Sequence, residues 1–95
     1  MTKLRELDLN GNRIGYISEK LGNLIDLEIL NLSDNDISYL PREMSKLSKL
    51  RIFKFAKNSL KFLPSTFAFL SRLAFADLSD NRLIDFGSPT NRLFR

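Results

Sequence analysis

The stretch LEILNLSDNDISYLP, residues 27–41, decides the fold of this chain. Its apolar positions and its central Asn35 return along the chain at a step of 23 residues. Four leucines mark this step: Leu4, Leu27, Leu50 and Leu73. The same step holds in eight columns, which begin at Leu4, Leu7, Leu9, Asn12, Ile14, Ile17, Leu21 and Leu24. Columns that keep one register indicate an internal repeat whose apolar residues form a shared core.

Each unit changes its periodicity partway along. Leu30, Asn31 and Leu32 alternate as a half-buried strand does, whereas Met44 to Leu47 has the spacing of three typical of a helical or 3₁₀ turn. The asparagine between them carries donors and an acceptor, so we expect it to bond to backbone groups of the bend and to the next asparagine in the stack. One unit cannot bury its apolar face alone. The units therefore stack. Their short parallel strands form one face, and the returns, which are the segments that lead from each bend back to the next strand, form the other.

These residues and the pattern L-x-x-L-x-L-x-x-N-x-L-x-x-L-P resemble the leucine-rich repeat family. The 23-residue form, seen best at residues 27–41, looks like the intracellular Ras-suppressor and Scribble-type group. The resemblance implies an α/β fold, a right-handed solenoid with a short parallel β-sheet on its concave face. It also implies that the concave sheet binds other proteins and has no catalytic residues. Two units depart from the pattern, since Ser18 and Gly87 stand where the proline is expected.

The resemblance divides the chain into one domain, residues 1–95, with four repeats and no separate caps. The repeats span residues 4–26, 27–49, 50–72 and 73–95. After Phe86, we expect residues 87–92 to form an irregular end. Solenoids normally have terminal units with a polar outer face. We therefore expect the ends to be covered by a longer chain, by neighbours or by self-association.

The composition excludes several classes of protein. Among 95 residues, 43% are hydrophobic and 27% are charged, and the formal net charge is +4. Because the chain has no Cys and no His, it cannot form a disulfide scaffold, a zinc finger or a Ser/His/Asp triad. We expect no enzyme activity, no metal and no cofactor. The start of the chain lacks the apolar stretch of a signal peptide, so we expect a cytoplasmic protein without a membrane span.

Residues that alternate with the core leucines should point to the concave face. One such column is Glu6, Ile29, Ile52 and Phe75, and it places large apolar side chains where solvent is expected. Apolar anchors with a charged rim are typical of a protein-binding patch, although β-branched and aromatic residues also simply favour strands. The predicted partner-binding residues are Ile29, Asn31, Ile52, Lys54, Lys57, Phe75 and Asp77. A second ladder, Tyr16, Tyr39 and Phe62, is expected mainly to pack along the edge of the stack.

Charge is distributed unequally along the chain. Residues 1–47 hold six basic and eight acidic side chains, whereas residues 48–95 hold nine basic and three acidic ones. The basic residues are dispersed, so a solvated surface is favoured over nucleic-acid binding. The leading hypothesis is a non-enzymatic protein-interaction module with a scaffold or signalling role. The alternative is a structural piece of a larger assembly, for example a ribonucleoprotein, contacted through its ends and basic half.

Overall fold

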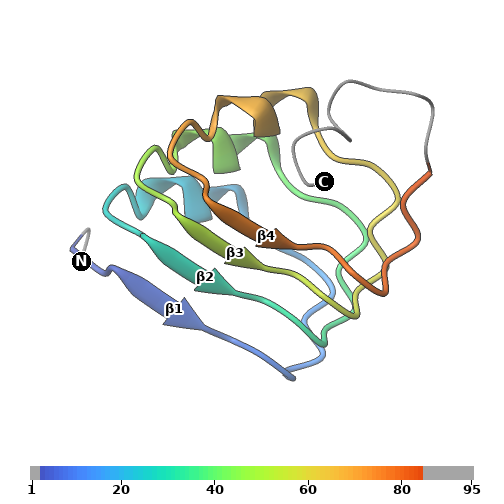
Figure 1. The fold of residues 1–95 in the computed structure, drawn as a ribbon. Coiled ribbons are helices and arrows are strands. Elements are labelled where there is room, and N and C mark those ends of the chain that lie inside the picture. The colour runs from blue at the N-terminus through green and yellow to red at the C-terminus, as the bar shows by residue number, and fades with distance from the viewer. Residues whose placement is uncertain (1–2, 85–95) are drawn as a thin grey trace.

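Strands and 3₁₀ turns alternate along the chain in the computed structural model, which describes residues 3–84 (Figure 1). The elements are β1 (Glu6–Asp8), η1 (Glu19–Asn23), β2 (Ile29–Asn31), η2 (Arg42–Lys46), β3 (Ile52–Lys54), η3 (Ser65–Phe69) and β4 (Phe75–Asp77). Each of the first three strands is followed by a wide bend and then by a segment that returns to the next strand through a helical turn. The predicted change of periodicity is thus confirmed in the first three units. The returns are 3₁₀ helices of one to two turns.

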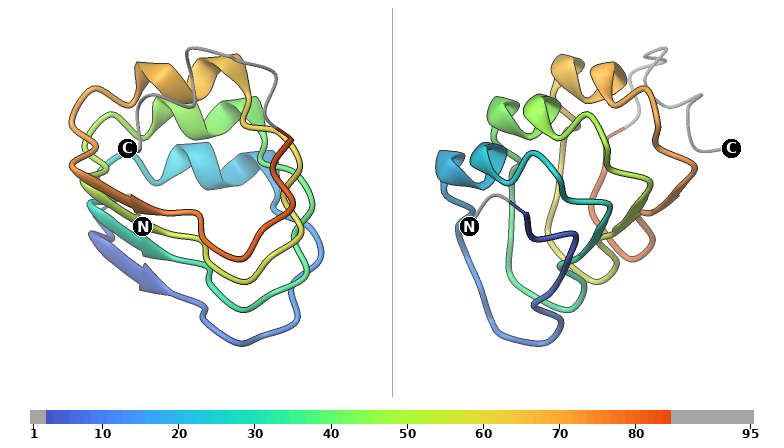
Figure 2. Two further views of the ribbon diagram at one scale, coloured as in Figure 1. Left: turned by 45° about the vertical axis from the view of Figure 1, so that its right-hand side comes forward. Right: turned by 90° about the vertical axis from the view of Figure 1, so that its left-hand side faces the viewer.

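The strands form one parallel sheet in the order β1-β2-β3-β4. In register, Glu6 pairs with Ile29, Ile29 with Ile52, and Ile52 with Phe75. Each pairing step is the 23-residue repeat, so the predicted columns are rows across the sheet. Figure 2 shows the sheet as one layer and the 3₁₀ helices as a second layer stacked in the same order. Among residues 3–84, no helix has the length and apolar character needed to cross a membrane.

The core lies between these two layers and is built from the predicted columns. Its aromatic centre is in the third unit, where the Phe53 ring lies 5.3 Å from that of Phe55 and 5.7 Å from that of Phe67. The fully buried large side chains are Phe53, Phe55, Phe67, Leu27, Leu30, Ile37, Met44, Leu47, Leu50 and Leu60. In the first unit Leu7, Leu9, Ile14, Leu21 and Leu24 are only partly buried. Burial is therefore deepest in the units that have a neighbour on both sides.

Asparagine side chains tie the bends of successive units together. The Asn35 Oδ1 accepts hydrogen bonds from the backbone N–H groups of Asn12 (3.0 Å) and Ile14 (2.8 Å) in the preceding unit. Its Nδ2 donates to the carbonyl oxygens of Leu9, Leu32 and Ser33. The expected bond to backbone groups is confirmed. The expected pairing with the next asparagine is wrong for the side chains, because the amide reaches the backbone of the neighbouring unit instead.

The first return shows how the missing proline is replaced. Pro41 and Pro64 precede η2 and η3 in extended conformation and make no side-chain cap. At the same position Ser18 caps η1, since its Oγ accepts a hydrogen bond from the Lys20 N–H at 3.1 Å. Phe86, the departure at Gly87 and the irregular end predicted for residues 87–92 lie outside the described residues. The structure thus describes three full units and the strand and bend of the fourth.

Candidate functional site

The outer face of the sheet carries the row of residues that the sequence predicts as a binding site. Ile29, Ile52 and Phe75 are adjacent in register on β2, β3 and β4. Ile29 and Ile52 are partly buried, whereas Phe75 is 51% exposed. Side chains one strand apart on the same face lie about 5 Å from each other. The three residues therefore form one continuous apolar strip, which is most open at Phe75.

The neighbouring row across the sheet is Asp8, Asn31, Lys54 and Asp77. Three of these side chains hold the turn that follows their own strand. An Oδ1 atom of Asp8, Asn31 or Asp77 accepts a hydrogen bond from the N–H two residues further on, at 3.0 to 3.1 Å. Such side-chain bonds satisfy backbone donors that leave the strand. These side chains serve the fold as well as the surface.

Lys54 is the exception in this row, because an ammonium group cannot accept a hydrogen bond. The backbone N–H of Ala56, which would need that acceptor, donates instead to the Ser33 Oγ of the preceding unit at 3.0 Å. Within the described residues the Lys54 ammonium makes no hydrogen bond. The Ser33 hydroxyl thus replaces the acceptor that Lys54 lacks. The exposed Lys54 side chain stays available on the sheet face.

The charge next to Lys54 is well defined. Asp77 accepts hydrogen bonds from the Ser79 Oγ at 2.7 Å and the Ser79 N–H at 3.0 Å. These bonds to Ser79, helped by the nearby Lys54 charge, hold the pKa of Asp77 below its ordinary value. Asp77 is therefore a carboxylate at neutral pH, beside the positive charge of Lys54. The row therefore places a positive and a negative charge side by side on neighbouring strands.

Lys57, the last predicted site residue, lies in the turn after β3. Its backbone is in the left-handed region with φ 58°, and its side chain is exposed. The equivalent positions hold Gly11, Asp34 and Asp80, which are also left-handed. Asp and Gly adopt this conformation readily, but Lys does so less readily. Lys57 thus occupies a backbone position to which its residue type is poorly suited.

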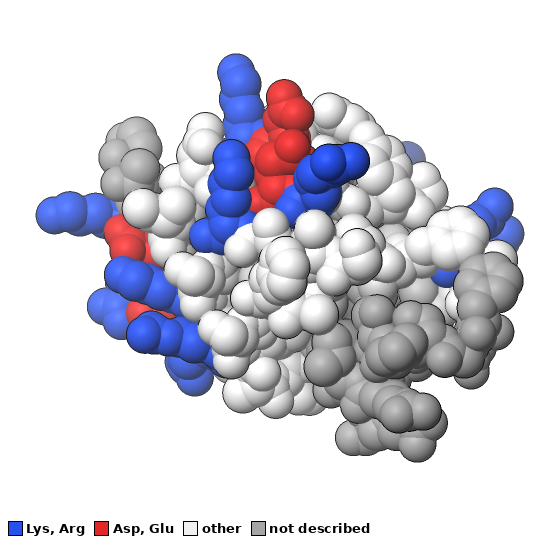
Figure 3. Space-filling model, turned by 90° about the horizontal axis from the view of Figure 1, so that it is seen from above, with Lys and Arg blue, Asp and Glu red and all other residues white. Residues whose placement is uncertain are grey.

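A ladder of charges lies where the strands begin, on another side of the molecule. Arg5 donates to Glu28 at 2.8 Å, Arg51 lies 3.6 Å from the other oxygen of Glu28, and Lys49 donates to Asp26 at 2.7 Å. Figure 3 shows blue and red side chains alternating on this side, at the left of the view. The hydrogen bond from Arg5 lowers the pKa of Glu28, and that from Lys49 lowers the pKa of Asp26.

This ladder reduces the significance of the basic C-terminal half. Lys49 and Arg51 belong to that half, but both are paired with carboxylates of the preceding unit. Part of the excess positive charge is therefore neutralised locally. A surface that attracts nucleic acid needs a contiguous set of unpaired cations. Among residues 3–84, no group of three or more Asp and Glu side chains is arranged to hold a metal ion.

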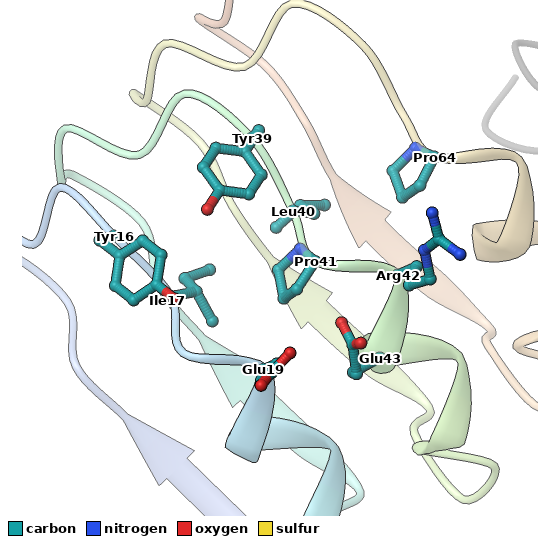
Figure 4. Close-up of a pocket in the computed structure, with 9 residues that line it drawn as sticks. All are labelled: Tyr16, Ile17, Glu19, Tyr39, Leu40, Pro41, Arg42, Glu43 and Pro64. Atoms are coloured by element: carbon teal, nitrogen blue, oxygen red, sulfur yellow. The ribbon is translucent and has the colours of Figure 1, made fainter.

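A groove on the flank of the stack, between the first and second units, is a feature that sequence reasoning missed. It measures about 370 Å³ and is lined by Tyr16, Ile17, Glu19, Tyr39, Leu40, Pro41, Arg42, Glu43 and Pro64. We call it the flank groove. Figure 4 shows the two tyrosine rings on one side of it and the carboxylates of Glu19 and Glu43 on the other. The tyrosine column was a signal for this groove, but the acidic residues fall in different columns of the repeat.

A second hollow opens at the first-unit end of the stack. It measures about 320 Å³ and is lined mainly by apolar side chains, among them Leu9, Ile14, Leu21 and Leu24. Within the described residues no further unit packs against this end. These four side chains are only partly buried at this end of the described stack.

Comparisons with known proteins agree with this architecture. A family model described as leucine-rich repeat matches residues 26–83, and one described as leucine-rich repeats in two copies matches residues 2–42. A solved leucine-rich repeat protein of Leptospira interrogans is 33% identical, with a TM-score of 0.84, over 95% of this chain and 22% of that one. An internalin of Listeria monocytogenes is 29% identical, with a TM-score of 0.78, over 86% of this chain and 23% of that one.

The search of curated proteins finds no match. The chain spans less than a quarter of the length of either solved structure.

Proposed function

The chain belongs to the leucine-rich repeat family, whose domains are generally protein-interaction modules, and from this premise we propose that it binds a protein partner on the outer face of its sheet. The proposed anchors are Ile29, Ile52 and Phe75. The proposed orienting residues are Asn31, Lys54, Lys57 and Asp77. The module acts without catalysis of its own. The narrower Ras-suppressor and Scribble-type grouping stays a prediction.

The observation that carries this proposal is the hydrogen-bond pattern around Lys54. Every other member of its row accepts a hydrogen bond that closes the turn after its strand. At Lys54 the fold gives up this bond and uses Ser33 in its place. A residue that breaks a local rule while a neighbour compensates for it supports a functional role. Lys57, in its left-handed conformation, supports the same role.

The chemistry of this face defines the partner. Phe75 and Ile52 offer an apolar strip, and Lys54 and Lys57 stand beside it as cations. Four strands about 4.8 Å apart make a face roughly 14 Å wide, which fits a short segment of a protein and not a whole domain surface. The partner should insert one or two apolar side chains over the strip and place a carboxylate against the lysines.

The test is capture of the partner from the native source, compared across three forms of the chain. The double variant Ile52→Glu/Phe75→Glu puts charge on the strip and should abolish capture. The matched control is Phe69→Glu, which charges a phenylalanine of η3 that is 69% exposed and lies away from the sheet face. Circular dichroism and melting should match among the three. Undiminished capture by the double variant would overturn the site.

The orienting residues are then tested by measuring the affinity of their variants for the captured partner. Lys54→Glu should weaken binding, measured by calorimetry, and the loss should shrink as salt rises, because exposed charges are screened. A scaffold or signalling role in the cytoplasm is part of the same proposal. Imaging of a fluorescent fusion of the full protein checks that location.

The end hollow favours a second candidate function, a structural piece of a larger assembly. Apolar side chains such as Leu9 and Leu24 surround the opening at the first-unit end. If neighbours or other copies cover this end, light scattering after size exclusion should give a mass that rises with concentration. Leu24→Lys should suppress that rise. A monomer at high concentration, with undisturbed capture on the sheet face, would contradict the structural role and leave the first proposal standing.

A further inference from the structure

The flank groove carries exposed aromatic side chains on a face that the proposed function does not use. Tyr16 is 61% exposed and Tyr39 is 51% exposed, as much as Phe75 on the sheet face. Their ring centroids lie 6.3 Å apart with the planes tilted by 58°. The two rings therefore pack on each other, as expected from the sequence, but each keeps an open face. Phe62 extends the same ladder in the third unit and is 55% exposed.

The walls of the groove combine polar side chains with the prolines that precede the second and third returns. Pro41 and Leu40 are buried against the core, and Pro64 lies beside them at the start of the next return. The two prolines hold extended backbone with φ −68° and −63°. A volume of about 370 Å³ lies within the range of about 300–1,000 Å³ that is usual for ligand-binding clefts. The groove is thus large enough for two or three side chains of a bound segment.

The rim of the groove opposite the tyrosines is acidic. In Figure 4 the carboxylates of Glu19 and Glu43 both lie on this rim, whereas the Arg42 guanidinium points toward Pro64. The repeat columns would place Glu19 beside Arg42, and Glu43 beside Lys20, but neither pair forms an ion pair. Over residues 3–84, all three ion pairs lie at the strand starts. Both carboxylates are therefore available to a cation from outside.

We propose that the flank groove binds an extended segment of a partner protein that carries a lysine or arginine next to proline. The cation lies between Glu19 and Glu43, and the proline rings pack on the open faces of Tyr16 and Tyr39. Proline-rich segments suit aromatic-lined grooves because they are already extended and lose little conformational entropy on binding. The tyrosine hydroxyls can donate to carbonyl oxygens of such a segment, which has no internal hydrogen bonds.

The flank groove and the sheet face are separate surfaces of the same stack. The groove is lined by Tyr16, Tyr39 and the residues that lead into the returns, and none of the proposed sheet-face residues lines it. The chain could therefore hold two different segments at once. This inference does not depend on the sheet-face proposal, and either can fail alone.

The test uses two fluorescein-labelled synthetic peptides and the full chain. One peptide alternates proline with lysine, and its matched partner has glutamate in place of every lysine. Fluorescence anisotropy should show saturable binding of the lysine peptide, with an affinity about tenfold or more above that of the glutamate peptide. Amide shifts of the ¹⁵N-labelled chain should concentrate at residues 16–19 and 39–43. Lack of saturable binding, or equal binding of both peptides, overturns the proposal.

Variants separate the groove from general charge attraction. Glu19→Gln/Glu43→Gln keeps the shape of the rim and should weaken the lysine peptide about tenfold, whereas Tyr16→Ser/Tyr39→Ser should remove binding. The matched controls are Glu6→Gln on the sheet and Phe69→Ser in η3, which lie outside the groove lining and should leave the affinity unchanged. Loss of binding in the controls, or unchanged binding in Glu19→Gln/Glu43→Gln, would assign the peptide to another surface. A melting curve for each variant checks that it folds.

Discussion

Phe53 and Ala76 are neighbours in the register of β3 and β4, so the bulkiest member of this core column lies beside the smallest. The other members are Leu7 and Leu30, of intermediate size. Side chains on one face of adjacent strands are in contact. Because protein interiors are close-packed, a large side chain in one unit requires a smaller one next to it. The two departures from leucine therefore compensate each other.

This compensation predicts coupling between two substitutions. Phe53→Leu leaves a void beside Ala76, and Ala76→Leu overpacks the space beside Phe53, so each should lower the free energy of unfolding. The double variant restores leucine in both units and should lose about 1 kcal/mol less than the sum of the single losses. Urea unfolding of the four proteins measures this cycle. Additive losses would show that the two residues do not share space.

Asn35 should be among the most sensitive residues of the chain. It is buried and makes five hydrogen bonds to backbone groups of two units. Asn35→Ala leaves buried backbone groups unsatisfied and should lower the free energy of unfolding by about 3 kcal/mol. The control is Asn12→Ala at the exposed equivalent position, which should cost less than about 1 kcal/mol. Equal losses in urea unfolding would contradict the role given to Asn35.

Two glycines offer opposite outcomes for the same substitution. A Cβ atom at Gly22 would lie 2.6 Å from the Glu43 carbonyl oxygen, whereas at Gly15 nothing lies within 4 Å. Gly22→Ala should therefore push η1 away from η2 and cost about 1–3 kcal/mol. Gly15→Ala should be neutral or stabilise by up to about 1 kcal/mol, because it restricts the unfolded chain. Melting temperatures of the two variants, measured side by side, test the contact between the two returns.

We predict that Lys57 lowers the stability of the fold but strengthens binding of the partner. Its left-handed backbone conformation costs a residue with a long side chain about 1–2 kcal/mol, and asparagine tolerates it better. Lys57→Asn should therefore raise the free energy of unfolding by about 0.5–1 kcal/mol. The same substitution should weaken binding of the partner to the sheet face. The control Lys61→Asn, at an exposed position without positive φ, should change neither. A less stable Lys57→Asn protein would remove the argument from backbone strain.

The ion pairs where the strands begin predict that the stability of the chain depends on pH. The pKa values of Asp26 and Glu28 are lowered from their ordinary 3.8 and 4.5 by Lys49 and Arg5. The folded chain therefore binds fewer protons than the unfolded chain in acid. The stabilisation is complete above about pH 5 and is lost as the pH falls through the lowered values.

Urea midpoints between pH 7 and pH 2 measure this loss. Glu28→Gln should flatten the acid limb, and added salt should do the same, because these groups are partly exposed and therefore screened. Glu43→Gln is the control, since Glu43 forms no ion pair within the described part of the chain. An acid limb that is identical in all three proteins would exclude the ladder as its cause.

The 23-residue columns determined the repeat, the parallel sheet, its register and the row Ile29, Ile52 and Phe75. This was possible because stacking places equivalent residues side by side, so the sequence period is also the spatial neighbourhood. Each pairing in the sheet follows that period. The leucine-rich repeat family and the solenoid fold are confirmed. The sheet-face binding residues stay a prediction.

Tertiary structure decided how polar groups are shared between units. Asn35 bonds to the backbone of its neighbour and not to the next amide, and Ser33 supplies the acceptor that Lys54 lacks. Glu19 and Glu43 come from different columns and yet border one groove. A column assigns a side chain to a face but does not choose its hydrogen-bond partner. That choice depends on which donors and acceptors the folded backbone brings within reach.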